Sequence, residues 1–348
     1  MDGFAARRVA ELPLGQVDQV RPMAAGCWLV QRSKANELLV VDAQLAPVWW
    51  LQLPAADYGV DPVTDEHSDW EQEHRLPYRQ HGTHAVTDDL SLVALALRRH
   101  VLVLDGHGQE VARFGHQPWR IGESGCCGFS RRGRDLWAIV PPRPERFFWP
   151  SAELWLIDLR GKSVVDWRKL EAISVGCQPV HHPDGQTIGL DIGEGQDGSW
   201  IRWARADRGR IDLRFGPEWD RGLTAVHPDG DEYLTTPHPC GANTLVRHQF
   251  ADDRPVEELA AADVLGPDER WDFYAGYLTN TLILASTMEI GQDSGRHVLV
   301  QRAPMRLLGE VVYSDRELPG WIVGPHQDTW LTVGDHGVQR WTLAGPAG

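Results

Sequence analysis

The stretch GLTAVHPDGDEYLTT, residues 222–236, has the pattern of two short strands joined by a tight turn. The turn lies at HPDG, residues 227–230. Proline fixes φ there, aspartate bonds back to the local backbone, and glycine accepts a positive φ. The stretch GCQPVHHPDGQTIGL, residues 176–190, repeats this pattern one unit earlier. The two stretches therefore indicate an internal repeat built from β-hairpins.

Looser copies extend the repeat along the chain, at residues 83–93, 125–137, 274–284 and 321–331. The turns lie roughly 45 to 52 residues apart, the period of a propeller blade. We therefore predict an all-β fold, a β-propeller of four-stranded antiparallel blades, with seven blades as the expected count and six or eight as the alternatives. The expected single domain is 1–348, with blades at 20–53, 83–115, 125–168, 176–216, 222–265, 272–314 and 320–344.

The two ends of the chain complement each other in this scheme. The last repeat supplies only three strands, and residues 4–12 form a strand-like stretch without a hairpin partner nearby. We expect this N-terminal strand to complete the C-terminal blade, because that pairing closes the ring and removes sheet edges.

Several repeats share a run of apolar residues that ends in an aspartate before a short polar turn, as at Val41-Asp42, Leu104-Asp105 and Ile157-Asp158. This pattern resembles the bacterial WD40-like and YncE-like β-propeller repeat proteins over nearly the full chain, and the resemblance implies the fold. The sequence departs from true WD40 repeats, because it lacks the Trp-Asp pair at the end of the third strand and the Gly-His that opens a blade. The resemblance therefore implies no particular partner.

The composition favours a soluble, cytoplasmic protein. The formal charge is −15, which argues against nucleic acid as a partner, because phosphate affinity comes from clustered Lys and Arg. The preference for Arg over Lys is typical of a GC-rich bacterial genome. No apolar run approaches the roughly 20 residues that cross a bilayer, and the N-terminus lacks the apolar core of a signal peptide, so we expect no membrane contact. The five cysteines are odd in number and lack Cys-x-x-Cys spacing, as in a reduced compartment.

The extra residues gather on one side of the predicted ring. Turns after the first and third strands of a blade emerge on one face, and here they are short; we call this the tight-turn face. His181, His182 and His227 lie on it, and we expect turn and surface roles for them. The loop-rich face carries the other turns, the connections between blades and almost every insertion. Long loops carry function disproportionately, so we place the function on the loop-rich face.

Two insertions on that face are candidates for partner binding. Residues 54–81 form an acidic inserted loop that we expect to act as a lid on the channel mouth, with a solvated loop as the alternative. Residues 141–152 hold three consecutive aromatics between prolines, which is typical of a preorganised contact surface, with packing on a neighbouring blade as the alternative. Together with the inner strands, the predicted ligand- or partner-binding residues are Trp70, Tyr78, Arg143, Arg146, Phe147, Phe148, Trp149, Cys177, Gln178, Tyr274 and Trp321.

An enzyme working at the channel mouth is the alternative function, of lyase, cyclase, isomerase or hydrolase type, acting on a small molecule or peptide. A cysteine nucleophile needs an imidazole neighbour to lower its pKa, and Cys127 with His84 is the pair that the aligned inner strands bring together. Imidazole also suits proton transfer near neutral pH. The candidate catalytic residues are His84, Cys127, His74 and His238. The alternative for the cysteines is that a crowded axis demands small side chains.

We expect no cofactor and no metal site. The segment GEGQDG, residues 193–198, has the Gly-x-Gly-x-x-Gly pattern of a dinucleotide-binding loop. However, it lies between two expected strands, opens no helix and carries two acidic residues, which would repel a phosphate. The acids of this segment also lack the twelve-residue calcium pattern. The first hypothesis is therefore a platform that binds an unknown protein or peptide on the loop-rich face and the channel mouth.

Overall fold

The computed structural model describes residues 2–15, 17, 19–23, 26–32, 35–53, 83–119, 123–130, 133, 135–143, 151–172, 174, 176–194, 198–216, 220–238, 241–289, 295–314, 321–326, 328–334 and 337–344. Within these ranges the regular structure is almost entirely β-strand. The α-helix found there, α2 (Ala261–Val264), is a single turn.

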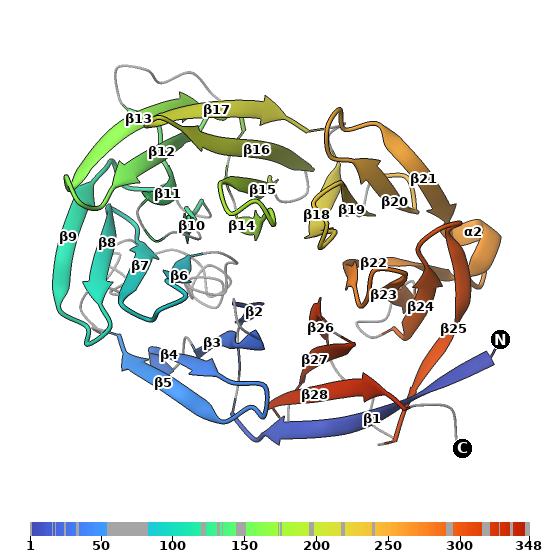
Figure 1. Ribbon diagram of the computed structural model, residues 1–348. Helices are drawn as coiled ribbons and strands as arrows, with labels where there is room; N and C mark the ends of the chain where they lie inside the picture. The colour runs from blue at the N-terminus through green and yellow to red at the C-terminus, as the bar shows by residue number, and fades with distance from the viewer. Residues whose placement is uncertain are drawn as a thin grey trace, which may run out of the picture.

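Figure 1 looks along the axis of a ring of small antiparallel sheets, the blades of a β-propeller. Five blades are separate 4-stranded sheets, and an 8-stranded sheet contains the remaining two. In each of the first six blades the strands follow chain order from the inside of the ring to its rim. This arrangement confirms the predicted fold.

The first four blades contain four strands each. Blade one contains β2 (Gln19–Pro22), β3 (Trp28–Arg32), β4 (Glu37–Val41) and β5 (Pro47–Gln52). Blade two contains β6 (His84–Val86), β7 (Leu92–Ala96), β8 (His100–Asp105) and β9 (Glu110–Gly115). Blade three contains β10 (Cys127–Phe129), β11 (Asp135–Val140), β12 (Glu153–Asp158) and β13 (Ser163–Lys169). Blade four contains β14 (Gly176–His181), β15 (Thr187–Gly193), β16 (Ser199–Asp207) and β17 (Arg210–Phe215).

The last three blades follow the same plan. Blade five contains β18 (Arg221–Val226), β19 (Glu232–Pro237), β20 (Thr244–Gln249) and β21 (Pro255–Ala260). Blade six contains β22 (Glu269–Tyr277), β23 (Leu282–Glu289), β24 (His297–Gln301) and β25 (Arg306–Tyr313). Blade seven contains β26 (Trp321–His326), β27 (Thr329–Gly334), β28 (Gly337–Leu343) and, as its outer strand, β1 (Asp2–Leu12).

The N-terminal strand closes the ring as predicted. β1 pairs antiparallel with β28, from Ala6 opposite Leu343 to Leu12 opposite Val338. Its first residues also pair in parallel with β25, from Asp2 opposite Gly309 to Ala6 opposite Tyr313. β1 thus joins blades six and seven into one sheet, a second pairing that the sequence did not predict.

The repeated HPDG turns form as expected. The Gly185 N–H donates to the His182 carbonyl at 3.0 Å, and the Gly230 N–H donates to the His227 carbonyl at 2.8 Å. Both glycines have positive φ, 70° and 79°. Glycine accepts this backbone conformation at little cost, whereas a side chain would strain it.

The aspartate that ends the third strand of several blades stabilises the turn that follows it. Asp42 Oδ1 accepts the N–H groups of Gln44 at 2.8 Å and of Ala46 at 2.9 Å. Asp105 Oδ1 does the same for two turn N–H groups, and Asp158 uses both carboxylate oxygens. The repeated aspartate is therefore structural, because it satisfies turn N–H groups that have no ladder partner.

Apolar side chains fill the interfaces between blades, and each interface holds its own cluster of buried residues. Broad rings suit these flat contacts, and the largest fully buried side chains include Trp137, Trp203, Trp330 and Trp341. Within the described ranges, no helix is long and apolar enough to cross a membrane.

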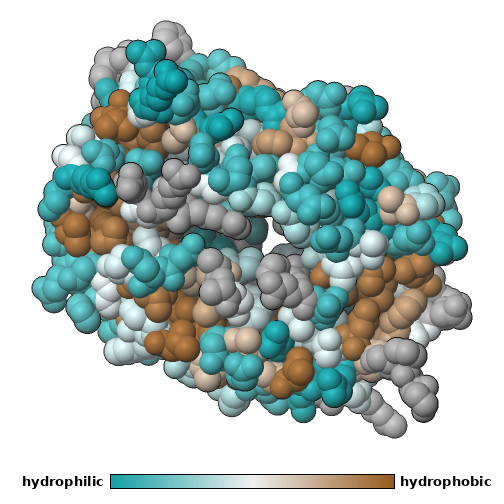
Figure 2. Space-filling view, viewed as in Figure 1, coloured by the Kyte–Doolittle hydropathy of each residue, from teal (hydrophilic) through white to brown (hydrophobic). Residues whose placement is uncertain are grey.

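The strand bounds separate the two faces of the disc. The described residues between the second and third strands of blades three, four and five lie on the loop-rich face: 141–143, 151–152, 194, 198, 238 and 241–243. The turns on the opposite face are shorter, as in the hairpin of Arg208 and Gly209 between β16 and β17. Figure 2, viewed along the same axis as Figure 1, shows a largely hydrophilic face that is hollowed at its centre, with hydrophobic patches separated from one another.

Candidate functional site

His84 is the first residue of β6 and Cys127 is the first residue of β10. These are the inner strands of the neighbouring blades two and three. The Cys127 Sγ–H donates to the carbonyl oxygens of Thr83 at 3.5 Å and Ala94 at 3.4 Å. The His84 Nδ1 lies 2.7 Å from the Thr83 hydroxyl. The thiol therefore packs against the backbone that carries the imidazole. Both side chains are only 1% exposed.

Burial keeps both groups uncharged at neutral pH. Burial, followed by the charge of the nearby Arg21 guanidinium, which donates to the His84 carbonyl, lowers the pKa of His84 to about 3. Burial also raises the pKa of the Cys127 thiol, and the neighbouring Cys126 adds to this rise. A thiol rather than a thiolate lies beside a neutral imidazole, so this arrangement does not supply the activated nucleophile that the enzyme hypothesis needs. The catalytic role of the pair stays a prediction.

Cys177 and Gln178 lie on β14, the inner strand of blade four. Cys177 is buried against Cys126, and burial followed by this contact raises the pKa of its thiol. Gln178 is half-buried and pairs in register with Asp191 of β15. The two predicted residues therefore differ in access, because alternate residues of a strand face opposite sides of the sheet.

Asp191 is a titratable group that the predicted site did not include. The Leu223 N–H of blade five hydrogen-bonds its carboxylate, and a Cβ at Gly222 would lie 3.8 Å from its Oδ2. Its Oδ1 is buried and has no hydrogen-bond partner among the described residues. Burial raises the pKa of Asp191 to about 7, so this carboxyl group gains and loses its proton near neutral pH.

Tyr274 lies within β22, the inner strand of blade six, and Trp321 begins β26, the inner strand of blade seven; both residues are half-buried. Burial, with a smaller effect of Asp272, raises the pKa of Tyr274 to about 12. Trp321 packs against the cluster between blades seven and one. Both side chains contribute to packing at the inner edge of the ring.

Arg143 lies at the start of the insertion between β11 and β12. Its Nε lies 3.5 Å from the buried Glu153 carboxylate, and its guanidinium lies 5.5 Å from the centre of the Trp167 ring. This arginine therefore has packing and charge partners within its own blade. The predicted residues His74, Trp70, Tyr78, Arg146, Phe147, Phe148 and Trp149 lie outside the described residues.

His238 lies in a recess on the loop-rich face, between blades five and six. Its Nδ1 is 2.8 Å from Asp220 Oδ1, and its backbone N–H donates to the Asp220 carbonyl at 3.1 Å. The recess has a volume of about 80 Å³ and is lined by Pro237, His238, Gly241, Asn243, Arg270, Trp271, Phe273 and Met288. The residues that line the recess lie in or next to loops of the loop-rich face, where the sequence analysis placed the function.

Two donors of this recess are held without a complete set of partners. The Arg270 Nε is buried and has no hydrogen-bond partner among the described residues. The Asn243 Oδ1 accepts the Trp271 N–H at 2.9 Å, which fixes its amide nitrogen as the remaining donor. Phe273 lies beside them and is 43% exposed. The recess thus combines a cation, an amide donor and an exposed aromatic ring.

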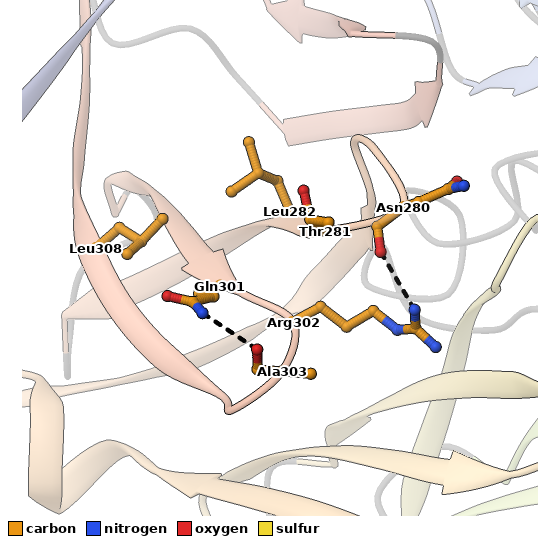
Figure 3. Close-up of a pocket in the computed structure, with 7 residues that line it drawn as sticks. All are labelled: Asn280, Thr281, Leu282, Gln301, Arg302, Ala303 and Leu308. Atoms are coloured by element: carbon orange, nitrogen blue, oxygen red, sulfur yellow. Dashed lines mark hydrogen bonds between the residues drawn. The ribbon is translucent and has the colours of Figure 1, made fainter.

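A larger hollow, of about 340 Å³, lies on the tight-turn face of blade six, and Figure 3 shows the residues that line it. Its polar groups already bind one another. Arg302 donates to the Asn280 carbonyl at 3.2 Å and pairs with Glu232 at 3.0 Å, and Gln301 donates to the Ala303 carbonyl at 3.1 Å. We therefore favour the smaller recess at His238, where Arg270 still lacks such partners.

Sequence reasoning found His238 but missed Arg270 and Asn243. Blade six was expected to begin at residue 272, whereas β22 begins at Glu269. The alternating residues 269–274 carried the signal that could have extended this strand. No group of three or more His, Cys, Asp or Glu side chains in the described ranges is placed to hold a metal ion.

Comparisons with known proteins support the fold and no family. No family model matches the chain, and no curated protein matches it. The β-propeller domain of Cps50 (Swd1) from Myceliophteria thermophila is similar in structure, with a TM-score of 0.59 and 11% identity over 97% of this chain and 100% of that one. BamB from Moraxella catarrhalis has a TM-score of 0.51 and 11% identity over 99% of both chains. Hydrazine synthase from Kuenenia stuttgartiensis has a TM-score of 0.55 and 13% identity, covering 92% of this chain and 93% of that one.

Proposed function

We propose that this β-propeller is a binding platform that holds a protein or peptide segment against its loop-rich face. The observation that carries the proposal is the recess between blades five and six, where the exposed Phe273 ring lies next to the Arg270 guanidinium. Aromatic residues and arginine dominate the energy of protein interfaces, because they combine large contact area with directed polar contacts.

The chemistry of the inner strands supports binding over nucleophilic catalysis. Cys127 and His84 are buried and uncharged, so a substrate would meet neither a thiolate nor an accessible imidazole there. The recess at His238, by contrast, opens on the loop-rich face. Propellers serve as binding scaffolds and as enzymes alike, so the site rather than the fold supports this choice.

A comparison of two variants tests the platform. Phe273→Ala removes the exposed ring of the recess, and Val165→Ala removes an equally exposed apolar side chain, also 43% exposed, from the outer strand β13. Proteins retained from the native cell extract by the wild-type chain are identified, purified and titrated against all three proteins. We expect Phe273→Ala to weaken binding of the purified partner at least tenfold, and Val165→Ala to leave it unchanged. Equal binding by the three proteins would remove the recess from the proposal.

An acid–base enzyme is the second candidate function, and Asp191 is the residue that favours it. A general acid or base works best when its pKa lies near the working pH, and that of Asp191 lies at about 7. Incubation of a metabolite extract with wild-type protein and with Asp191→Asn, followed by mass spectrometry, tests this role. A metabolite consumed only by the wild-type protein supports the enzyme, and identical extracts after both incubations count against it.

A further inference from the structure

We propose that the recess between blades five and six is the anchor site for a carboxylate group, bound by Arg270 and Asn243, with an apolar side chain next to it on Phe273. This inference rests on the proposed function, because the carboxylate belongs to the protein or peptide that the loop-rich face binds. The proposal thus specifies the chemical group that the recess binds.

Among the described residues no carboxylate forms a salt bridge with Arg270, although the charge of Asp272 lies close enough to interact with it. The Asp220 Oδ1 lies 2.8 Å from the His238 Nδ1. Asp272 accepts the Phe273 N–H at 2.7 Å and the Ser286 hydroxyl at 3.0 Å. Arg270 is half-buried, and its buried Nε lacks an acceptor, which is unfavourable; an anion bound to the guanidinium would be stabilised by these free donors.

The geometry of the donors matches a carboxylate. Arginine presents a planar fork of N–H groups that a carboxylate can bind through both oxygens. The Asn243 amide nitrogen adds a neutral donor, because its oxygen already binds the Trp271 N–H. With a volume of about 80 Å³, the recess has room for a small head group rather than a whole substrate.

The surroundings favour a monoanion over a phosphate. Arg270 is the single Lys or Arg that lines the recess, whereas phosphorylated motifs are usually bound by clusters of arginines. The formal charge of the chain is −15, which further disfavours a dianion. Phe273, Met288 and Trp271 border the donors, so an apolar side chain next to the carboxylate would contact them.

Small probes test the chemistry directly. N-acetylphenylalanine carries a terminal carboxylate, N-acetyl-Asp-Phe-amide carries a side-chain carboxylate, and N-acetylphenylalaninamide carries neither. Binding of each probe, and of inorganic phosphate, is titrated by NMR on the full chain. We expect the two acids to bind with millimolar Kd, as small ligands do, and the amide not to bind. The tighter of the two acids identifies a chain terminus or an acidic side chain as the source.

Matched variants assign the contacts. Arg270→Gln should raise the Kd of both acids at least tenfold, whereas Arg205→Gln, on the exposed surface of β16, should leave it unchanged. Asn243→Asp keeps an oxygen for the Trp271 N–H but replaces the amide donor with a negative charge, so it should abolish binding of the acids. This isosteric change keeps the test valid if Arg270→Gln fails to fold, which thermal unfolding would show.

Several results would overturn the carboxylate anchor. These are equal binding of the amide and the acids, unchanged Kd in Arg270→Gln and Asn243→Asp, or tighter binding of phosphate that depends on Arg270. Failure of the carboxylate anchor can be distinguished from failure of the binding platform. A purified partner that depends on Phe273 but not on Arg270 would keep the platform and refute the anchor. Acid probes that depend on Arg270, without any partner that depends on Phe273, would keep the anchor and refute the platform.

Discussion

Single residues of the HPDG turns connect neighbouring blades as well as reversing the chain. The His182 Nε2–H donates to the Gly230 carbonyl in the turn of the next blade, at 2.9 Å, and its ring stacks on Phe250 with 4.2 Å between centroids. The Asp184 N–H donates to its Nδ1 at 3.2 Å. The sequence predicted the turn, but the buried position of His182 depends on the neighbouring blade, which the local pattern does not describe.

Gly230→Ala should destabilise the protein more than Gly209→Ala. Both positions have positive φ, 79° and 75°, so each alanine costs about 1 kcal/mol in backbone strain. At Gly230 a Cβ would also lie 2.9 Å from His182 Cε1, whereas at Gly209 it meets nothing within 4 Å. We expect about 1–3 kcal/mol of further loss at Gly230, measured by urea unfolding. Equal losses would show that the imidazole moves aside freely.

Asp191→Asn should stabilise the protein in a pH-dependent way. Burial raises the pKa of Asp191 from its ordinary value to about 7. The folded state therefore holds a proton that the unfolded state has released, and this contribution to stability is lost as pH rises from about 4 to 7. Asparagine removes the buried charge, so the variant should be more stable at pH 8 by about 1–2 kcal/mol, a figure reduced for partial solvent access. Thermal melts at pH 5 and pH 8 check this, and an equal gain at both pH values would refute the assigned pKa.

Hairpins are the elements that the sequence predicted best, because each carries its own turn chemistry. The aspartate that ends the third strand was read as part of the repeat pattern, and the structure gives it a role in binding turn N–H groups. Where an element lacks such a signal, its boundary was missed, as at Glu269 and at α2. Arg270 escaped the predicted site for this reason.

Asp42→Ala should weaken the β4–β5 hairpin, and Asp42→Asn should largely preserve it. The carboxylate oxygen accepts the N–H groups of Gln44 and Ala46, and an amide oxygen in the same place can accept them too. We expect a loss of about 1 kcal/mol in the free energy of unfolding for alanine. Urea unfolding compares the three proteins, and hydrogen exchange of the two turn amides locates the change. Similar losses for alanine and asparagine would point to charge rather than hydrogen bonding.

At the scale of the whole ring, repeat period and chain ends were sufficient to predict the blades and their closure. They were not sufficient for the site, because a site depends on which residues of different blades meet. The alignment of inner strands did place His84 near Cys127, but their burial follows from the packing of blades two and three. His238 was chosen for its residue type in a loop, whereas its neighbours come from other elements: Asp220 directly precedes β18, and Arg270 lies on β22.

Ring closure makes the stability of the molecule depend on its first strand. Ala6 is buried against the cluster between blades six and seven, where β1 passes from β25 to β28, whereas Ala5, its neighbour on the same strand, is exposed. Ala6→Asp would bury an unpaired charge, and we expect a loss of about 3 kcal/mol or more in the free energy of unfolding. Ala5→Asp adds the same charge outside and should change stability by less than about 0.5 kcal/mol. Urea unfolding measures both, and equal stability of the two variants would mean that the β1 closure contributes little to holding the ring together.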